Sequence, residues 1–305
     1  MPKTAQYHAC VIGVGSMGLG MAQSCVAAGL PTCGIDPIGS KRELFAASGV
    51  QAVAATAAEL DGAFDAVVLA VANADQCRTA LFGDSGTSGH LAAATPVMIC
   101  STVATADAIA INAALERRGL LMLDAPMSGG PLKASQGALT IMAAGPNEAF
   151  AKLKPVLDAV AERVYTVGPD IGKGSTVKII HQLLAVVHIA AAAEAIALAA
   201  RAGIPLDLMC DVVVHAAGNF WMFENRMNHV VNGDYTPRSA VDIFVKDLGL
   251  VTEIGRVHRF PLPLASTAQN MFVHASASGF GNEDDSAVIK IFPGITLPEM
   301  RPEQE

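Results

Sequence analysis

Residues 8–36 read HACVIGVGSMGLGMAQSCVAAGLPTCGID: an apolar strand, a glycine-rich turn, a helix and a second strand that ends in an aspartate. The turn has the spacing G-x-G-x-x-G. In this spacing the first glycine permits the tight turn, the second lets the backbone approach a pyrophosphate, and the third allows close packing of helix on strand. The N-terminus of the helix offers unpaired N–H groups to the anion. The stretch predicts a dinucleotide site of the Rossmann type that includes Gly13, Gly15, Ser16, Met17 and Gly18.

Glycine-rich turns also occur for packing alone, so the prediction needs a second feature. Asp36 supplies it, because it ends the next strand, where a carboxylate accepts hydrogen bonds from the adenosine ribose. A 2′-phosphate about 4 Å away would be repelled by roughly 4 kcal/mol at an effective dielectric near 20. We therefore expect NAD to be preferred over NADP, with Lys41 and Arg42 close enough to weaken the preference.

Short apolar strands alternate with alanine-rich helical stretches from residue 7 to about 125, and further strands follow at 137–145 and 163–167. This alternation predicts a mostly parallel sheet with crossover helices. Loops after its strands should line the cofactor crevice. Asn73 and Thr102 follow two of the strands and are candidate cofactor contacts, although Asn73 and the adjacent Ser101 are equally good helix N-caps.

After residue 172 the pattern is helical, with segments at 174–202, 205–217, 219–231, 239–257, 263–278 and 284–291. The sequence thus predicts an α/β protein with a Rossmann-type NAD-binding domain at 1–171 and an all-α substrate and dimerisation domain at 172–305. The helix at 174–202, about 40 Å long, should join them.

Composition narrows the class of partner and the compartment. A net charge of −8 without a long Lys/Arg run argues against nucleic acid. Only 16% of residues are charged and 52% are hydrophobic, so we expect a broad interface in a homodimer or homotetramer. The six cysteines form no CxxC pair, which favours a cytoplasmic location and no metal site. His188 and Glu194 interrupt the apolar run at 183–200, which favours a buried or interfacial helix over a membrane span.

Lys178, His181 and Gln182 are spaced i, i+3 and i+4 on the joining helix and should share one face. A partly dried lysine beside the cofactor could have its pKa lowered enough to act as the general base for an alcohol. A solvated lysine is the ordinary alternative. Earlier in the chain, Ser128, Gly129 and Gly130 follow a strand and could form a nest for a substrate carboxylate, or merely a flexible turn.

Five segments together resemble the β-hydroxyacid dehydrogenase family: GVGSMG, ICSTVAT, DAPMSGG, GKGSTVKIIHQ and IFVKDLGL. The resemblance covers nearly the whole chain and implies that Lys178 is the catalytic lysine. It further implies that residues 128–130 hold the substrate carboxylate and that Thr102 and Lys246 contact the cofactor. Gln182 stands where the family usually has asparagine, which leaves the pocket size open.

Within the family, segments such as AAGNFWMFENRM and EDDSAVIKIF are similar to the branch that oxidises L-threonate to a 2-oxo acid. We expect that reaction, with 3-hydroxyisobutyrate or tartronate-semialdehyde chemistry as the alternative and imine reduction as a remoter one. A nucleotide-binding protein without catalysis is the rival of another class, but it would need neither Lys178 nor the nest. Trp221 could belong to the core or line the substrate pocket, and the sequence leaves that open.

Overall fold

The structure is a computed structural model that describes residues 7–60 and 63–300. Contacts divide the chain into two compact units, Met1–Lys178 and Ile179–Glu305. One continuous helix runs from the first unit into the second. The domain boundary predicted between residues 171 and 172 therefore stays a prediction.

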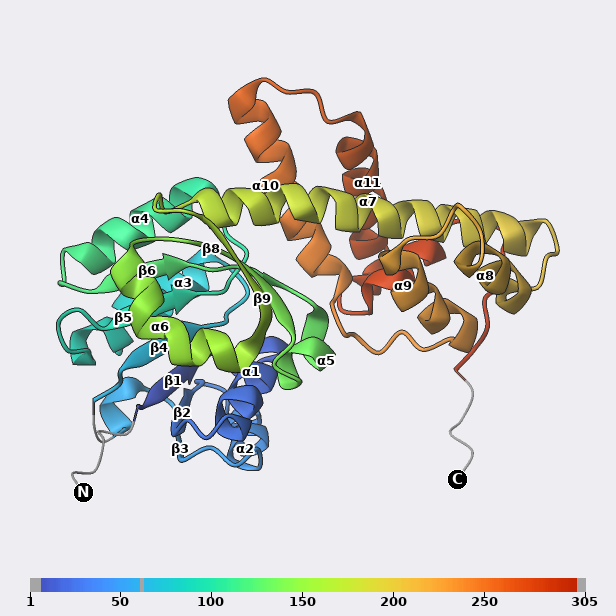
Figure 1. Ribbon diagram of the computed structural model, residues 1–305. Helices are drawn as coiled ribbons and strands as arrows, with labels where there is room; N and C mark the ends of the chain where they lie inside the picture. Colours follow the sequence, from blue (N-terminus) through green and yellow to red (C-terminus); the bar gives the residue numbers. More distant parts are fainter. Residues whose placement is uncertain (1–6, 61–62, 301–305) are drawn as a thin grey trace. The chain divides into compact units, whose positions relative to one another are not determined.

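The first unit is built on a mixed sheet of nine strands within the described residues (Figure 1). The neighbours β3-β2-β1-β4-β5-β6 are parallel; β8 runs antiparallel to β6 and β7, and β9 is parallel to β8. The mostly parallel sheet predicted from the sequence is confirmed. Its strands are β1 (Ala9–Ile12), β2 (Thr32–Ile35), β3 (Ala52–Ala54), β4 (Ala66–Leu69), β5 (Pro96–Ile99), β6 (Leu121–Asp124), β7 (Met127–Ser128), β8 (Leu139–Ala144) and β9 (Ala161–Gly168).

Helices cover both faces of this sheet, because side chains alternate between the faces along each strand. In β1, Ala9 and Val11 pack into the core beneath α1, α5 and α6, whereas Cys10 and Ile12 pack into the core beneath α3 and α4. The helices are α1 (Ser16–Ala27), α2 (Gly39–Ala46), α3 (Ala74–Phe82), α4 (Thr105–Glu116), α5 (Gly130–Ser135) and α6 (Asn147–Val160), with short 3₁₀ turns at Ala57–Glu59 and Thr87–His90.

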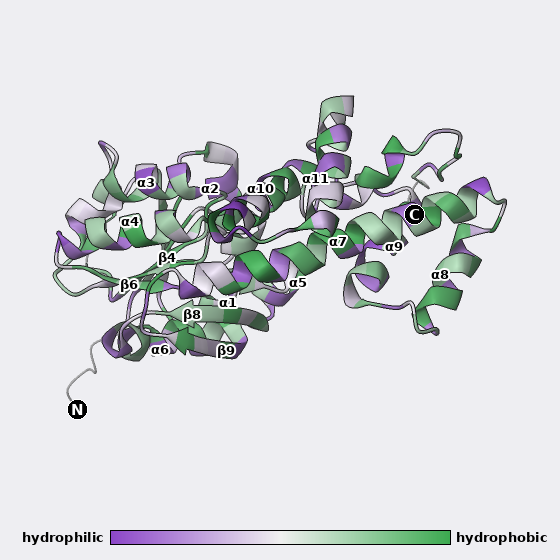
Figure 2. Cartoon of the chain, turned by 90° about the horizontal axis from the view of Figure 1, so that it is seen from above, coloured by the Kyte–Doolittle hydropathy of each residue, from purple (hydrophilic) through white to green (hydrophobic). Residues whose placement is uncertain are grey.

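The second unit is helical, as the sequence predicts. Its elements are α7 (Lys173–Arg201, which begins in the first unit), α8 (Leu206–Val214), α9 (Trp221–Asn232), α10 (Val241–His258), α11 (Pro263–Ala275), a π turn (Ser276–Phe280) and a 3₁₀ segment (Asp285–Ile291). By length and composition α7 is apolar enough to cross a membrane, and Figure 2 shows its hydrophobic character. However, Val186, Ile189 and Ile196 are buried in the core of the helical unit itself. These contacts are those of a core helix in a soluble protein.

A buried polar cluster ties α9 to the 3₁₀ segment. Asp284 accepts hydrogen bonds from the Ser286 hydroxyl at 2.7 Å and lies 2.9 Å from Nδ1 of His229. Burial pushes the pKa of Asp284 upward, but these hydrogen bonds outweigh burial and hold it at about 2. Asp285 accepts two hydrogen bonds from Nε of Arg226, yet burial raises the pKa of Asp285 to about 7.

Two expectations about local structure were wrong. The segment at 284–291 forms a 3₁₀ helix, because Asp284 caps it through the N–H of Ser286 and its bonds run from i to i+3. Trp221 belongs to no core, since it is 54% exposed on the first turn of α9. The neighbouring Phe220 packs instead, with its ring centroid 4.7 Å from that of His188.

Candidate active site

The glycine-rich turn connects β1 to α1. A Cβ on Gly18 would lie 2.0 Å from the carbonyl oxygen of Gly13, so only glycine permits this approach of helix to turn. A Cβ on Gly15 would meet nothing within 4 Å, so this backbone faces open space. Gly15 is also the N-cap of α1, and no side chain caps the helix. The turn therefore has both the room and the N–H groups that a pyrophosphate needs.

Asp36 is buried at the end of β2 and braces this turn. Its carboxylate accepts the N–H of Val14 at 3.0 Å and the N–H of Ile38 at 2.9 Å. Each carboxylate oxygen has a second lone pair, so both can still accept a ribose hydroxyl. Arg42 donates from Nη1 to the carbonyl oxygen of Asp36 at 2.8 Å. An arginine thus lies beside the acid, in line with the expectation that it weakens discrimination against a 2′-phosphate.

The loops after β4 and β5 lie at the same edge of the sheet as the turn, because these strands run parallel to β1. Asn73 is the N-cap of α3 and accepts the N–H of Gln76 at 2.9 Å. Ser101 caps no helix; its hydroxyl oxygen accepts the N–H of Val71 at 3.2 Å and ties the two loops together. Thr102 follows directly and is half-buried.

The Ser128-Gly129-Gly130 segment is more ordered than a flexible turn. Ser128 ends β7, where it pairs with Thr140 of β8, and α5 begins at Gly130. Both glycines have positive φ angles, 137° and 75°. Ser128 is half-buried, and the segment follows the carboxyl end of β6 by three residues. A carboxylate can be bound here by a hydroxyl and by backbone N–H groups.

Asp124, the last residue of β6, attaches the start of α7 to the sheet. It is fully buried, and Oδ2 accepts the N–H groups of Gly172 and Ser175, both at 2.9 Å. Oδ1 accepts the Ser175 hydroxyl at 2.7 Å. Burial raises the pKa of Asp124, and these hydrogen bonds oppose the rise. A Cβ on Gly174 would lie 2.5 Å from the carbonyl oxygens of Asp124 and Met142, so the first turn of α7 is packed directly on β6 and β8.

Lys178 lies one turn further along α7 from Gly174, on the same face of the helix. Its side chain is only 6% exposed. Lysine is almost never so deeply buried without a structural or chemical reason. The docking of α7 by Asp124 therefore fixes the position of a buried amine relative to the strand that leads to Ser128.

The helical unit contains a second set of polar groups, at the following turn of α7 and on α10. Gln182 is buried, and its Nε2 donates to Oδ2 of Asp247 at 2.5 Å. Its Oε1 lies 3.1 Å from Nδ1 of His181. Lys246 forms an ion pair with Oδ1 of Asp247 at 2.8 Å. The sequence indicated Lys246, Gln182 and His181, but gave Asp247 no role.

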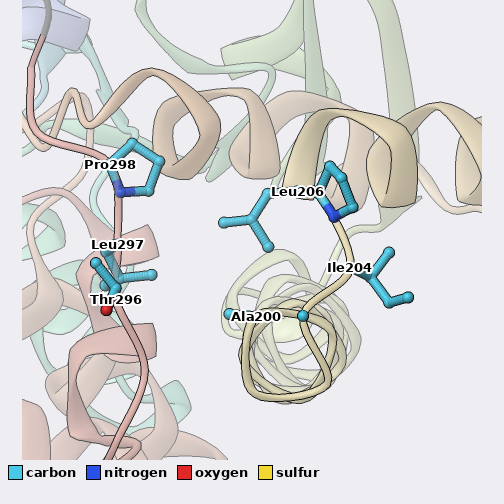
Figure 3. A pocket seen from close by; sticks show the side chains of 8 residues that line it. Ala200, Ile204, Leu206, Thr296, Leu297 and Pro298 are labelled. Atoms are coloured by element: carbon cyan, nitrogen blue, oxygen red, sulfur yellow. The ribbon is translucent and has the colours of Figure 1, made fainter.

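Two further features lie apart from these residues. In the part of the chain that the structure describes, no group of three or more His, Cys, Asp or Glu side chains could hold a metal ion. An open apolar groove of about 400 Å³ lies in the helical unit (Figure 3). None of the predicted site residues lines it; the labelled residues are Ala200, Ile204, Leu206, Thr296, Leu297 and Pro298.

Comparisons with known proteins cover both units. The sequence model for the NAD binding domain of 6-phosphogluconate dehydrogenase matches residues 8–168. The model for the NAD-binding region of NADP-dependent 3-hydroxyisobutyrate dehydrogenase matches residues 172–292. The chain is 59% identical over 305 residues to an L-threonate dehydrogenase of Pectobacterium atrosepticum, covering 99% of each chain. It is 58% identical to the L-threonate dehydrogenase of Escherichia coli K12, over 98% of this chain and 99% of the relative.

The solved structures include a close match as well. A crystal structure described as 3-hydroxyisobutyrate dehydrogenase from Salmonella typhimurium superposes with a TM-score of 0.90 at 60% identity, covering 94% of this chain and 100% of that one. Relatives of equal similarity thus carry the names of two different hydroxy acid dehydrogenases. The comparisons agree on the class of reaction and differ on the acid.

Proposed function

Because the chain belongs to the β-hydroxyacid dehydrogenase family, we propose that it oxidises L-threonate to the corresponding 2-oxo acid, with Lys178 as the general base. The family resemblance predicted from the five sequence segments is confirmed, and the chain is an NAD-dependent oxidoreductase. L-threonate is favoured as the substrate because relatives of that name align with almost the whole chain at 58% and 59% identity.

The first unit fits NAD. The open space at Gly15, the uncapped N-terminus of α1 and the buried carboxylate of Asp36 suit a pyrophosphate and a ribose. When bound, NAD supplies the hydride acceptor for alcohol oxidation. Asn73, Thr102 and Lys246 remain predicted cofactor contacts, supported by their place after β4 and β5 and by the family resemblance.

The burial of Lys178 is the observation that carries the mechanism. A general base must take the hydroxyl proton as the hydride leaves the carbon, so its amine must be held close to the alcohol and shielded from water. The 6% exposure of Lys178 and the docking of its helix through Asp124 support that role. The proposed site for the substrate carboxylate is Ser128 with the N–H groups of Gly129 and Gly130, which would orient the acid.

We also propose that the protein is a cytoplasmic homo-oligomer. Large apolar side chains are exposed along α7 and α8, which supports an interface formed by a second copy of the chain; they are Leu184, Leu198, Leu208 and Val212, each more than half exposed. All six cysteines are free and buried, which suits a reducing compartment.

The test is NADH formation with a panel of L-threonate, D-erythronate, 3-hydroxyisobutyrate and D-glycerate. We expect the highest kcat/KM with L-threonate. A higher value with 3-hydroxyisobutyrate would favour the alternative suggested by the Salmonella structure.

The role of Lys178 is tested by Lys178→Met. We expect kcat to fall by about 10² to 10⁴, the usual contribution of a positioned acid or base, while NADH still binds. Lys173→Met, which removes an exposed lysine from the first turn of the same helix, is the matched control. A Lys178→Met enzyme as fast as this control would refute the mechanism.

A further inference from the structure

The hydrogen bonds around Gln182 form a directional chain from α10 to α7. At one end, Asp247 is 2% exposed and forms an ion pair with Lys246 at 2.8 Å. The adjacent ammonium favours the ionised carboxylate, which can only accept hydrogen bonds. The Gln182 side chain must therefore turn its NH₂ group toward Asp247, and the 2.5 Å contact joins these two groups.

The orientation of this amide dictates the proton on the next group. With Nε2 committed to Asp247, the carbonyl oxygen Oε1 of Gln182 faces Nδ1 of His181 at 3.1 Å. A carbonyl oxygen can only accept, so Nδ1 must carry the hydrogen. In a neutral imidazole the other nitrogen, Nε2, is then a hydrogen-bond acceptor. His181 is otherwise exposed in the chain, so nothing but this chain of bonds selects between its two tautomers by geometry that the structure provides.

We propose that Asp247 is a positioning residue that acts through Gln182 to hold His181 as the Nδ1–H tautomer, so that Nε2 accepts a hydrogen bond from a hydroxyl of a polyhydroxy acid. His181 follows Lys178 by three residues on α7, so the two side chains emerge as neighbours on the helix surface. A base at Lys178 takes the proton of the reacting hydroxyl. An acceptor one position along the same face suits the hydroxyl on the adjacent carbon, which a monohydroxy acid lacks.

This inference rests on the proposed function for the identity of the hydroxyl, but the tautomer does not depend on it. The tautomer is read from the ¹⁵N chemical shifts of His181 in the full-length protein, assigned by comparison with His181→Asn. Above the titration of the ring we expect protonated Nδ1 and unprotonated Nε2 in the wild type. Gln182→Leu and Asp247→Leu should shift the ring toward the Nε2–H form that free histidine prefers. Asp247→Asn should restore Nδ1–H, because its amide oxygen still accepts from Gln182.

The ligand is tested by calorimetric binding of 2,3-dihydroxybutanoate and 2-hydroxybutanoate to the enzyme–NADH complex. Loss of the second hydroxyl should weaken binding to the wild type by about tenfold, the usual effect of one hydrogen bond, and should matter much less in His181→Ala. Glu194→Gln, an exposed change on the same helix, should retain the wild-type difference.

The outcomes separate the two proposals. A wild-type ring that carries its proton on Nε2, or a hydroxyl effect of equal size in His181→Ala and wild type, would overturn the role of Asp247 and His181 even if L-threonate is turned over. Failure to oxidise any sugar acid, with the Nδ1–H tautomer and the binding difference intact, would instead overturn the proposed reaction.

Discussion

Replacement of Asp124 should release the first turn of α7 from the sheet. Asp124→Ala leaves the buried N–H groups of Gly172 and Ser175 and the Ser175 hydroxyl without their acceptor. Each unpaired buried donor costs about 1–3 kcal/mol. Relief of the buried charge, which is penalised strongly enough to raise the pKa of Asp124, offsets part of this. We expect a net loss of about 3 kcal/mol in the free energy of unfolding.

Asp124→Asn should cost only about 1 kcal/mol, because its amide oxygen can accept the two N–H groups while its NH₂ donates to the rotated Ser175 hydroxyl. Both variants should also lower kcat, since they loosen the helix that positions Lys178, whereas the dissociation constant of NADH should change little. The measurement is urea unfolding with linear extrapolation, together with steady-state kinetics.

Asp158→Asn is a suitable control, because Asp158 is exposed and forms only an i,i+4 ion pair with Lys154, which is worth about 0.5 kcal/mol or less. If Asp124→Ala were as stable as this control, the carboxylate would not be what docks α7. If the stability fell as expected but kcat did not, docking would be separate from the position of Lys178.

Three further changes test other parts of the structure. Asp36→Asn removes the charge that repels a 2′-phosphate, so the ratio of kcat/KM for NADP over NAD should rise by up to about a thousandfold, given roughly 4 kcal/mol of repulsion; an unchanged ratio would contradict this. Gly18→Ala forces a Cβ against the carbonyl oxygen of Gly13 and should lower stability by about 1–3 kcal/mol, whereas Gly15→Ala, with open space around it, should keep its stability and lose NADH affinity in calorimetry. Asp284→Asn should lose about 2 kcal/mol at neutral pH, because the folded pKa of about 2 lies below the ordinary 3.8. That stabilisation is present above pH 3.8 and is lost as the pH falls through about 2, so unfolding curves of wild type and variant should converge on acidification; a constant gap would argue against it.

Much of the first unit could be predicted from local pattern. The alternation in β1 between Ala9 and Val11 on one side and Cys10 and Ile12 on the other is visible as an apolar run, and it needs helices on both faces. The G-x-G-x-x-G turn and Asp36 were recognisable because their spacing is set by one βαβ unit. Such features depend on residues close together in the sequence.

Features that depend on distant partners could not be predicted. The sequence gave no sign that Asp124 binds residues 48 and 51 positions later, or that Asp247 bonds to Gln182 across 65 residues. The order of Ser128 in β7 likewise comes from its pairing with β8, which overrides the flexibility of the glycines that follow. Trp221 misled for the same reason, since composition cannot tell which of two adjacent aromatics faces inward.

The continuity of α7 has a mechanical consequence. Lys178 and Gln182 are carried on one unbroken rod, so an insertion or deletion of a single residue between them would swing one side chain by about 100° relative to the other and shift it by about 1.5 Å. Loops elsewhere can absorb such changes in length, but this span cannot. The spacing of four residues between amine and amide is therefore as much a part of the catalyst as the two groups themselves.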